Sequence, residues 1–101
     1  MIKHIETKAE LEELLKEGDV LLDFFATWCG PCKMLSPVLE ELDRDEVPFQ
    51  IAKVDTDEAI DLAMEYHVQS IPTLIFFSEG KVVNRTLGYQ RKDQILAFCK
   101  K

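Results

Sequence analysis

Cysteine, glycine, proline and positive charge are all scarce in this sequence. Its 101 residues include three Cys, four Gly, four Pro and a single Trp. No apolar run approaches the roughly 20 residues that a membrane-spanning helix needs, and the first residues lack the apolar stretch of a secretory signal peptide. Acidic residues outnumber basic ones by 19 to 12, a formal net charge of −7. Nucleic acids and anionic membranes bind clustered positive charge, so this composition argues against both as partners.

The length fits one domain over residues 1–101, because two separate cores would be too small to fold. Hydrophobic residues at 47% and charged residues at 31% are typical of a soluble globular chain. We expect a cytoplasmic protein that acts as a monomer. Structural disulfides are rare in the cytoplasm, so three cysteines indicate chemistry or core filling and not a disulfide scaffold.

Hydrophobic periodicity predicts an α/β protein. Thr7 and Glu10 have the spacing of a capping box, which starts a helix that Gly18 ends. Pro31 suits the first turn of a second helix, and Pro37 inside it predicts a kink. Asp57 is predicted to cap a third. The helical apolar positions are Leu11, Leu14, Leu15, Met34, Leu35, Val38, Leu39, Leu42, Ile60, Ala63, Met64, Tyr66, Ile95, Leu96, Phe98 and Cys99. Strands are predicted at 20–26, 49–54, 73–77 and 82–87, with a further short one at 2–5.

The strongest chemical signal is Trp28-Cys29-Gly30-Pro31-Cys32, between a predicted buried strand and a helix. Two thiols separated by two residues can close a small disulfide ring. Unpaired amides at the helix N-terminus stabilise an anion and lower the pKa of the first thiol. This position therefore predicts a reactive cysteine pair.

Two alternatives compete with a redox pair. A structural zinc site needs a second pair of ligands, whereas Cys99, His4 and His67 are scattered singly. The second alternative is that Cys29 and Cys32 are a fortuitous buried pair without a redox role, although the Gly-Pro between them is poor core filler. Cys99 is expected to act as a small hydrophobe, with a regulatory thiol as the alternative.

The segment from Asp23 to Lys33, DFFATWCGPCK, resembles the active-site segment of the thioredoxin family. Ser70-Ile71-Pro72-Thr73 resembles the family's second signature, and Gly88, Lys53 and Pro37 match in type and spacing. The resemblance covers nearly the whole chain. It implies a thioredoxin fold, with a central mixed sheet of four or five strands flanked by about four helices.

Asp23 interrupts an apolar strand, which favours burial over an exposed edge position or a structural ion pair. A buried carboxyl group holds its proton more tightly and can exchange it near neutral pH. The resemblance implies that Asp23 takes the proton from Cys32 and that Lys53 is its charge partner. By sequence alone, Lys53 is typical of a solvated strand-end lysine.

Pro72 precedes an apolar strand, where an ordinary proline would follow a trans bond. The resemblance implies instead a cis Ile71–Pro72 bond facing the cysteines, with the Ile71 backbone pairing with an extended substrate. For Trp28, core packing is the alternative to a place on the substrate surface. The residues implied to contact substrate are Trp28, Gly30, Pro31, Ile71, Pro72 and Gly88.

The resemblance implies a protein-disulfide reductase in which Cys29 attacks and Cys32, expected to be more buried, resolves. Its partners would be disulfide-containing proteins and a thioredoxin reductase as electron donor. The two thiols are the redox group, so no cofactor or metal is expected. A disulfide oxidase or isomerase and a redox-inert binding module are the remaining alternatives.

Overall fold

The computed structural model describes residues 1–100 and consists of a mixed sheet between two pairs of helices. In chain order the elements are β1 (Lys3–His4), α1 (Lys8–Leu15), β2 (Val20–Phe25), α2 (Gly30–Arg44), β3 (Gln50–Asp55), α3 (Ile60–Glu65), β4 (Thr73–Ser78), β5 (Lys81–Leu87) and α4 (Lys92–Phe98). The predicted α/β class, the short first strand and the five-stranded alternative are confirmed.

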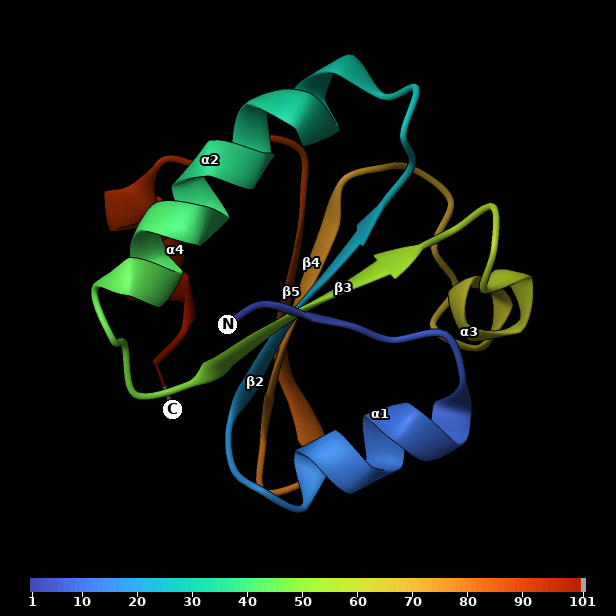
Figure 1. Cartoon of the computed structure of the whole chain (residues 1–101), viewed down its shortest axis with the longest axis horizontal. Helices are drawn as coiled ribbons and strands as arrows, with labels where there is room; N and C mark the ends of the chain where they lie inside the picture. Colours follow the sequence, from blue (N-terminus) through green and yellow to red (C-terminus); the bar gives the residue numbers. More distant parts are fainter. Residues whose placement is uncertain (101) are drawn as a thin grey trace.

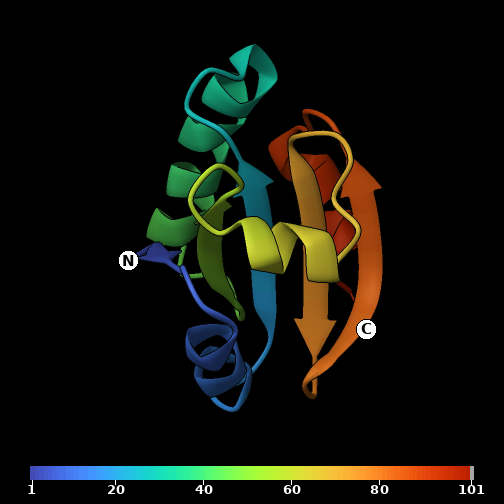
Figure 2. The same ribbon diagram turned by 90° about the vertical axis from the view of Figure 1, so that its right-hand side faces the viewer.

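The strand order is β1-β3-β2-β4-β5. β3 runs parallel to β1 and β2, while β4 runs antiparallel to both β2 and β5. Helices α1 and α3 cover one face of the sheet and α2 and α4 the other (Figure 1). Figure 2 shows the first face, with α3 lying across the sheet. β2 is therefore central, and its carboxyl end leads directly into α2.

Alternation along β2 supplies both faces of the core. Val20, Leu22 and Phe24 join the cluster under α1 and α3, while Leu21 joins the cluster under α2 and α4. Because side chains alternate along a strand, Asp23 faces the α2 side with Leu21. All six β2 residues except Phe25 are buried, as expected for a strand covered on both faces.

Local signals at the helix ends have mixed outcomes. The capping box of α1 is confirmed: Thr7 Oγ1 accepts from the Glu10 amide at 3.1 Å, and the Glu10 carboxylate accepts from the Thr7 amide at 3.0 Å. The predicted Asp57 cap of α3 is wrong, because the N-cap is Ala59 and no side chain caps it. The backbone amides of Glu58 and Ala59 instead donate hydrogen bonds to the carbonyl oxygen of Asp55.

Four of the apolar positions that indicated helices are exposed. They are Met34, Ile60, Met64 and Leu96. The six-residue α3 buries only Leu62 and Ala63, so one narrow side of it contacts the sheet. Helix α2 continues through Pro37, and the kink stays a prediction.

Candidate redox site

Cys29 and Cys32 form a disulfide where β2 passes into α2, with their Cα atoms 5.2 Å apart. Cys29 is the N-cap of α2, and its Sγ accepts a hydrogen bond from the Cys32 amide at 3.2 Å. Gly30 and Pro31 form the exposed first turn between them. A helix N-terminus stabilises negative charge, so the Cys29 sulfur lies where a thiolate is favoured.

The two cysteines are almost equally buried. Cys29 is 5% exposed and Cys32 is 4% exposed, so the expected greater burial of Cys32 is not found in the disulfide form. Both pack in a small cluster with Ala26. The feature that distinguishes the two sulfurs is the N-cap position of Cys29.

Asp23 lies on the strand that leads to the cysteines and is completely buried. Neither carboxyl oxygen has a hydrogen-bond partner among the described residues. Burial raises the pKa of Asp23 to about 7, and the charge of Lys53 opposes that rise. The predicted burial is confirmed, and the carboxyl group can gain or lose a proton near neutral pH.

Lys53 is the register neighbour of Asp23 on β3. Its Nζ donates to Ser36 Oγ on α2 at 3.1 Å and lies 4.7 Å from the centre of the Phe25 ring. Lys53 is partly buried, in contrast to a solvated strand-end lysine. No carboxylate in residues 1–100 makes an ion pair with it within 4.0 Å.

The second signature lies against the disulfide. The Ile71–Pro72 bond is cis, as the resemblance implies, and the carbonyl oxygen of Ile71 lies 3.8 Å from Cys29 Sγ. The Gly88 amide donates to the Pro72 carbonyl at 2.8 Å. Gly88 has a φ of +84°, a backbone conformation that glycine adopts without strain. The fold therefore brings the Ile71–Pro72 loop to Cys29, and Gly88 is hydrogen-bonded to that loop.

Trp28 is 68% exposed, so core packing is wrong and a surface position is confirmed. Its indole N–H donates to Asp57 Oδ2 at 2.8 Å. This contact fixes the orientation of the exposed ring, which belongs to the residue directly before Cys29. Sequence reasoning interpreted Asp57 as a helix cap and missed it as a site residue, because no local signal links positions 29 residues apart.

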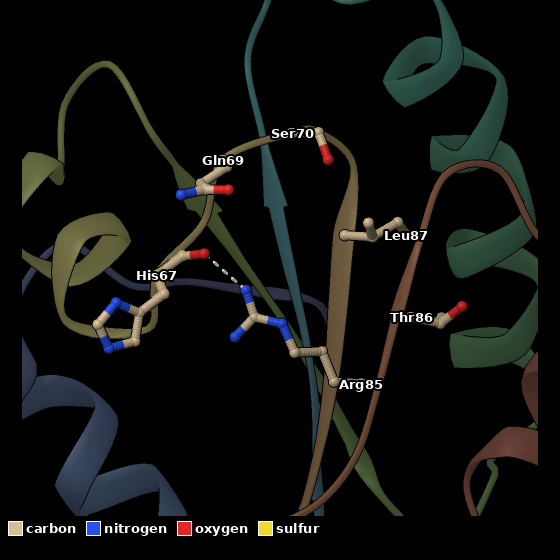
Figure 3. A pocket seen from close by; sticks show the side chains of 6 residues that line it. All are labelled: His67, Gln69, Ser70, Arg85, Thr86 and Leu87. Carbon is tan, nitrogen blue, oxygen red and sulfur yellow. Dashed lines mark hydrogen bonds between the residues drawn. The ribbon is translucent and has the colours of Figure 1, made fainter.

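Arg85 forms hydrogen bonds with the backbone that leads from α3 into the cis-proline loop. The Arg85 guanidinium on β5 donates to the carbonyls of Tyr66 and His67 at the end of α3, the latter at 2.9 Å (Figure 3). A cavity of about 370 Å³ lies next to the hydrogen bonds of Arg85. Its lining residues are His67, Gln69, Ser70, Arg85, Thr86 and Leu87.

Metal-ligating side chains do not gather elsewhere in the described chain: residues 1–100 contain no group of three or more His, Cys, Asp or Glu that could hold a metal ion. Within the same residues, no helix is long and apolar enough to cross a membrane. Burial raises the pKa of the remaining thiol, Cys99, to about 12.

Comparisons with known proteins agree with this geometry. The thioredoxin family model matches residues 2–101. A thioredoxin from Mycoplasmoides gallisepticum is 43% identical over 100 residues, covering 98% of this chain and 100% of the relative. A Staphylococcus aureus thioredoxin is 48% identical over 90 residues, covering 88% and 86% respectively.

Solved structures show the same fold. A mutant thioredoxin from Halobacterium salinarum superposes with a TM-score of 0.88 at 36% identity, covering 99% of this chain and 92% of its own. The chain is therefore a thiol–disulfide oxidoreductase with Cys29 and Cys32 as its disulfide-forming pair. By family model, sequence identity and fold, it belongs to the thioredoxin family.

Proposed function

We propose that this chain reduces disulfide bonds in other proteins, with Cys29 as the attacking thiol and Cys32 as the resolving thiol. The observation that carries the assignment is the hydrogen bond from the Cys32 amide to Cys29 Sγ at the start of α2. The same amide and helix end stabilise a Cys29 thiolate in the reduced protein. Cys32 lies inside the helix without such a cap.

The reaction proceeds in two exchanges. The Cys29 thiolate attacks one sulfur of the substrate disulfide, and the other substrate sulfur leaves as a thiolate. Cys32 then loses its proton, attacks Cys29 Sγ and releases the second substrate thiolate. Two electrons pass from the protein thiols to the substrate, and the Cys29–Cys32 disulfide remains.

Asp23 is the proposed acceptor of the Cys32 proton. The ionised carboxylate must take it, and a pKa of about 7 leaves a substantial ionised fraction at neutral pH. Lys53 is the proposed modulator, because its positive charge lowers the pKa that burial raises. A general base is most effective when its pKa lies close to the working pH.

The proposed substrate surface consists of Trp28, Gly30, Pro31, Ile71, Pro72 and Gly88. The proximity of the Ile71 carbonyl to Cys29 Sγ supports it, because a substrate segment paired with that backbone would present its disulfide to the sulfur. The exposed Trp28 ring adds apolar contact area. The proposal also includes a thioredoxin reductase that reduces the Cys29–Cys32 disulfide again. It further includes a monomeric state, one domain over residues 1–101 and a cytoplasmic location.

Trapping of the mixed disulfide tests the two thiol roles. A Cys32→Ser variant is expected to accumulate a stable mixed disulfide with a protein substrate, whereas Cys29→Ser is not. Cys99→Ser is the matched control and should turn over normally. Trapping by Cys29→Ser but not by Cys32→Ser would contradict the assignment. Equilibration with glutathione tests the direction: a strongly oxidising potential would indicate an oxidase instead.

A further inference from the structure

The Lys53 ammonium is held by two contacts, and neither of them is a carboxylate. Ser36 Oγ accepts its hydrogen bond at 3.1 Å, and the face of the Phe25 ring lies 4.7 Å from Nζ. The hydroxyl comes from α2 and the ring from the end of β2. The hydrogen bond to a charged donor and the cation–π contact both favour this position of the ammonium.

Asp23 lies close enough to Lys53 in the sheet for an ion pair, yet none forms. The two residues are register neighbours on adjacent parallel strands and lie on the same face. Nevertheless, both Asp23 oxygens lack any partner among the described residues. A buried carboxylate beside a flexible lysine ordinarily gains from pairing, so another interaction must hold the ammonium away.

The remaining titratable groups near this pair are few. Cys32 lies in the first turn of α2, and the β4 neighbour of Asp23 is the apolar Leu74. On the outer side, the groups around Lys53 line a cavity of about 180 Å³ with it: His4, Glu6, Asp55 and Glu58. None of their carboxylates makes an ion pair with Lys53 within 4.0 Å.

We propose that Ser36 and Phe25 are positioning residues that hold the Lys53 ammonium out of salt-bridge contact with Asp23. The inference rests on the proposed role of Asp23 as proton acceptor. Because the Lys53 ammonium makes no ion pair with Asp23, its positive charge acts on the carboxyl group without a direct bond. A direct bond would favour the ionised form strongly and make the carboxylate a weak base.

The Ser36→Ala variant removes the hydroxyl anchor. Lys53 is then free to approach Asp23, and the titration midpoint of the Asp23 carboxyl group should fall by about one pH unit. Ser36→Thr keeps a hydroxyl at the same position and should leave the midpoint unchanged. Phe25→Leu removes the ring without changing charge and should shift the midpoint in the same direction as Ser36→Ala. The measurement is ¹³C NMR of the Asp23 side chain in the oxidised full chain.

A Lys53→Met background distinguishes positioning from a general structural effect. In that background Ser36→Ala should no longer move the Asp23 midpoint, because the lysine through which it acts is absent. An unchanged or raised midpoint in Ser36→Ala, or an equal shift in the Lys53→Met background, would overturn the proposal. Failure of the proposed function looks different: the wild-type Asp23 itself would then titrate far from pH 7.

Discussion

Asp23 makes the stability of this protein depend on pH. In an unfolded chain the carboxyl group would titrate near 3.8, whereas in the folded protein burial raises its pKa to about 7. Between these values the folded chain binds more protons than the unfolded one, so stability falls as pH rises. The stability associated with the neutral carboxyl group is complete below the unfolded pKa and is lost as pH rises through the folded pKa.

The size of the effect follows from the two pKa values. One pKa unit corresponds to about 1.4 kcal/mol, so the full penalty for ionising buried Asp23 is about 4 kcal/mol. About 3 kcal/mol of this accumulates between pH 5 and pH 9. An Asp23→Asn variant cannot ionise. We therefore expect its free energy of unfolding, relative to wild type, to improve by about 3 kcal/mol between those two pH values.

Urea unfolding of the oxidised proteins at pH 5 and pH 9, followed by far-UV circular dichroism, measures the difference. The comparison cancels any constant cost of placing an amide in the core, because only the pH dependence is used. Asp61 is an exposed carboxylate on α3, and Asp61→Asn is the matched control: its free energy of unfolding relative to wild type should be the same at pH 5 and pH 9. An equal pH dependence in Asp23→Asn and wild type would refute the reasoning, since burial would then not oppose ionisation.

Three further predictions concern contacts around the site. Asp57→Ala removes the acceptor of the Trp28 indole; we expect lower fluorescence anisotropy of this single tryptophan and slower insulin reduction, and unchanged anisotropy would contradict the contact. Arg85→Lys cannot span two backbone carbonyls and should lower the free energy of unfolding by about 1 kcal/mol, with an unchanged urea midpoint as the contrary result. Because burial raises the pKa of Cys99 to about 12, iodoacetamide should modify it at pH 8 far more slowly than Cys29 in the reduced protein; Cys99→Ala identifies its signal, and equal rates would be inconsistent with that burial.

The parts of the fold that sequence predicts well are those specified by neighbouring residues. The capping box at Thr7 involves a residue three positions away, and the buried run of β2 is continuous along the chain. The exposure of Met34 and Met64 could not be predicted in this way. Apolar spacing identifies a helix, but how much of its surface is covered depends on the sheet beneath it. Six-residue α3 contacts that sheet along one narrow side.

In the site, too, short motifs could be predicted from the sequence, whereas contacts between distant residues could not. The cysteine pair and the cis-proline loop are carried by short motifs whose resemblance to a family could be recognised. The contacts between Trp28 and Asp57 and between Lys53 and Ser36 join positions 29 and 17 residues apart. Only the register of β2 with β3 and the docking of α2 bring these groups together. No periodicity in the sequence encodes either contact.

The burial of Asp23 was predictable from its apolar neighbours, but its lack of a partner was not. Pairing depends on where the Lys53 ammonium lies, and that in turn depends on a hydroxyl from α2 and a ring from β2. An ion pair with Asp23 would reduce the penalty for ionisation and stabilise the fold at high pH. It would also make the carboxylate a poorer acceptor for the Cys32 proton. In the proposed mechanism, the cost in stability and the capacity for proton transfer therefore have one physical cause: a buried carboxyl group without a direct partner.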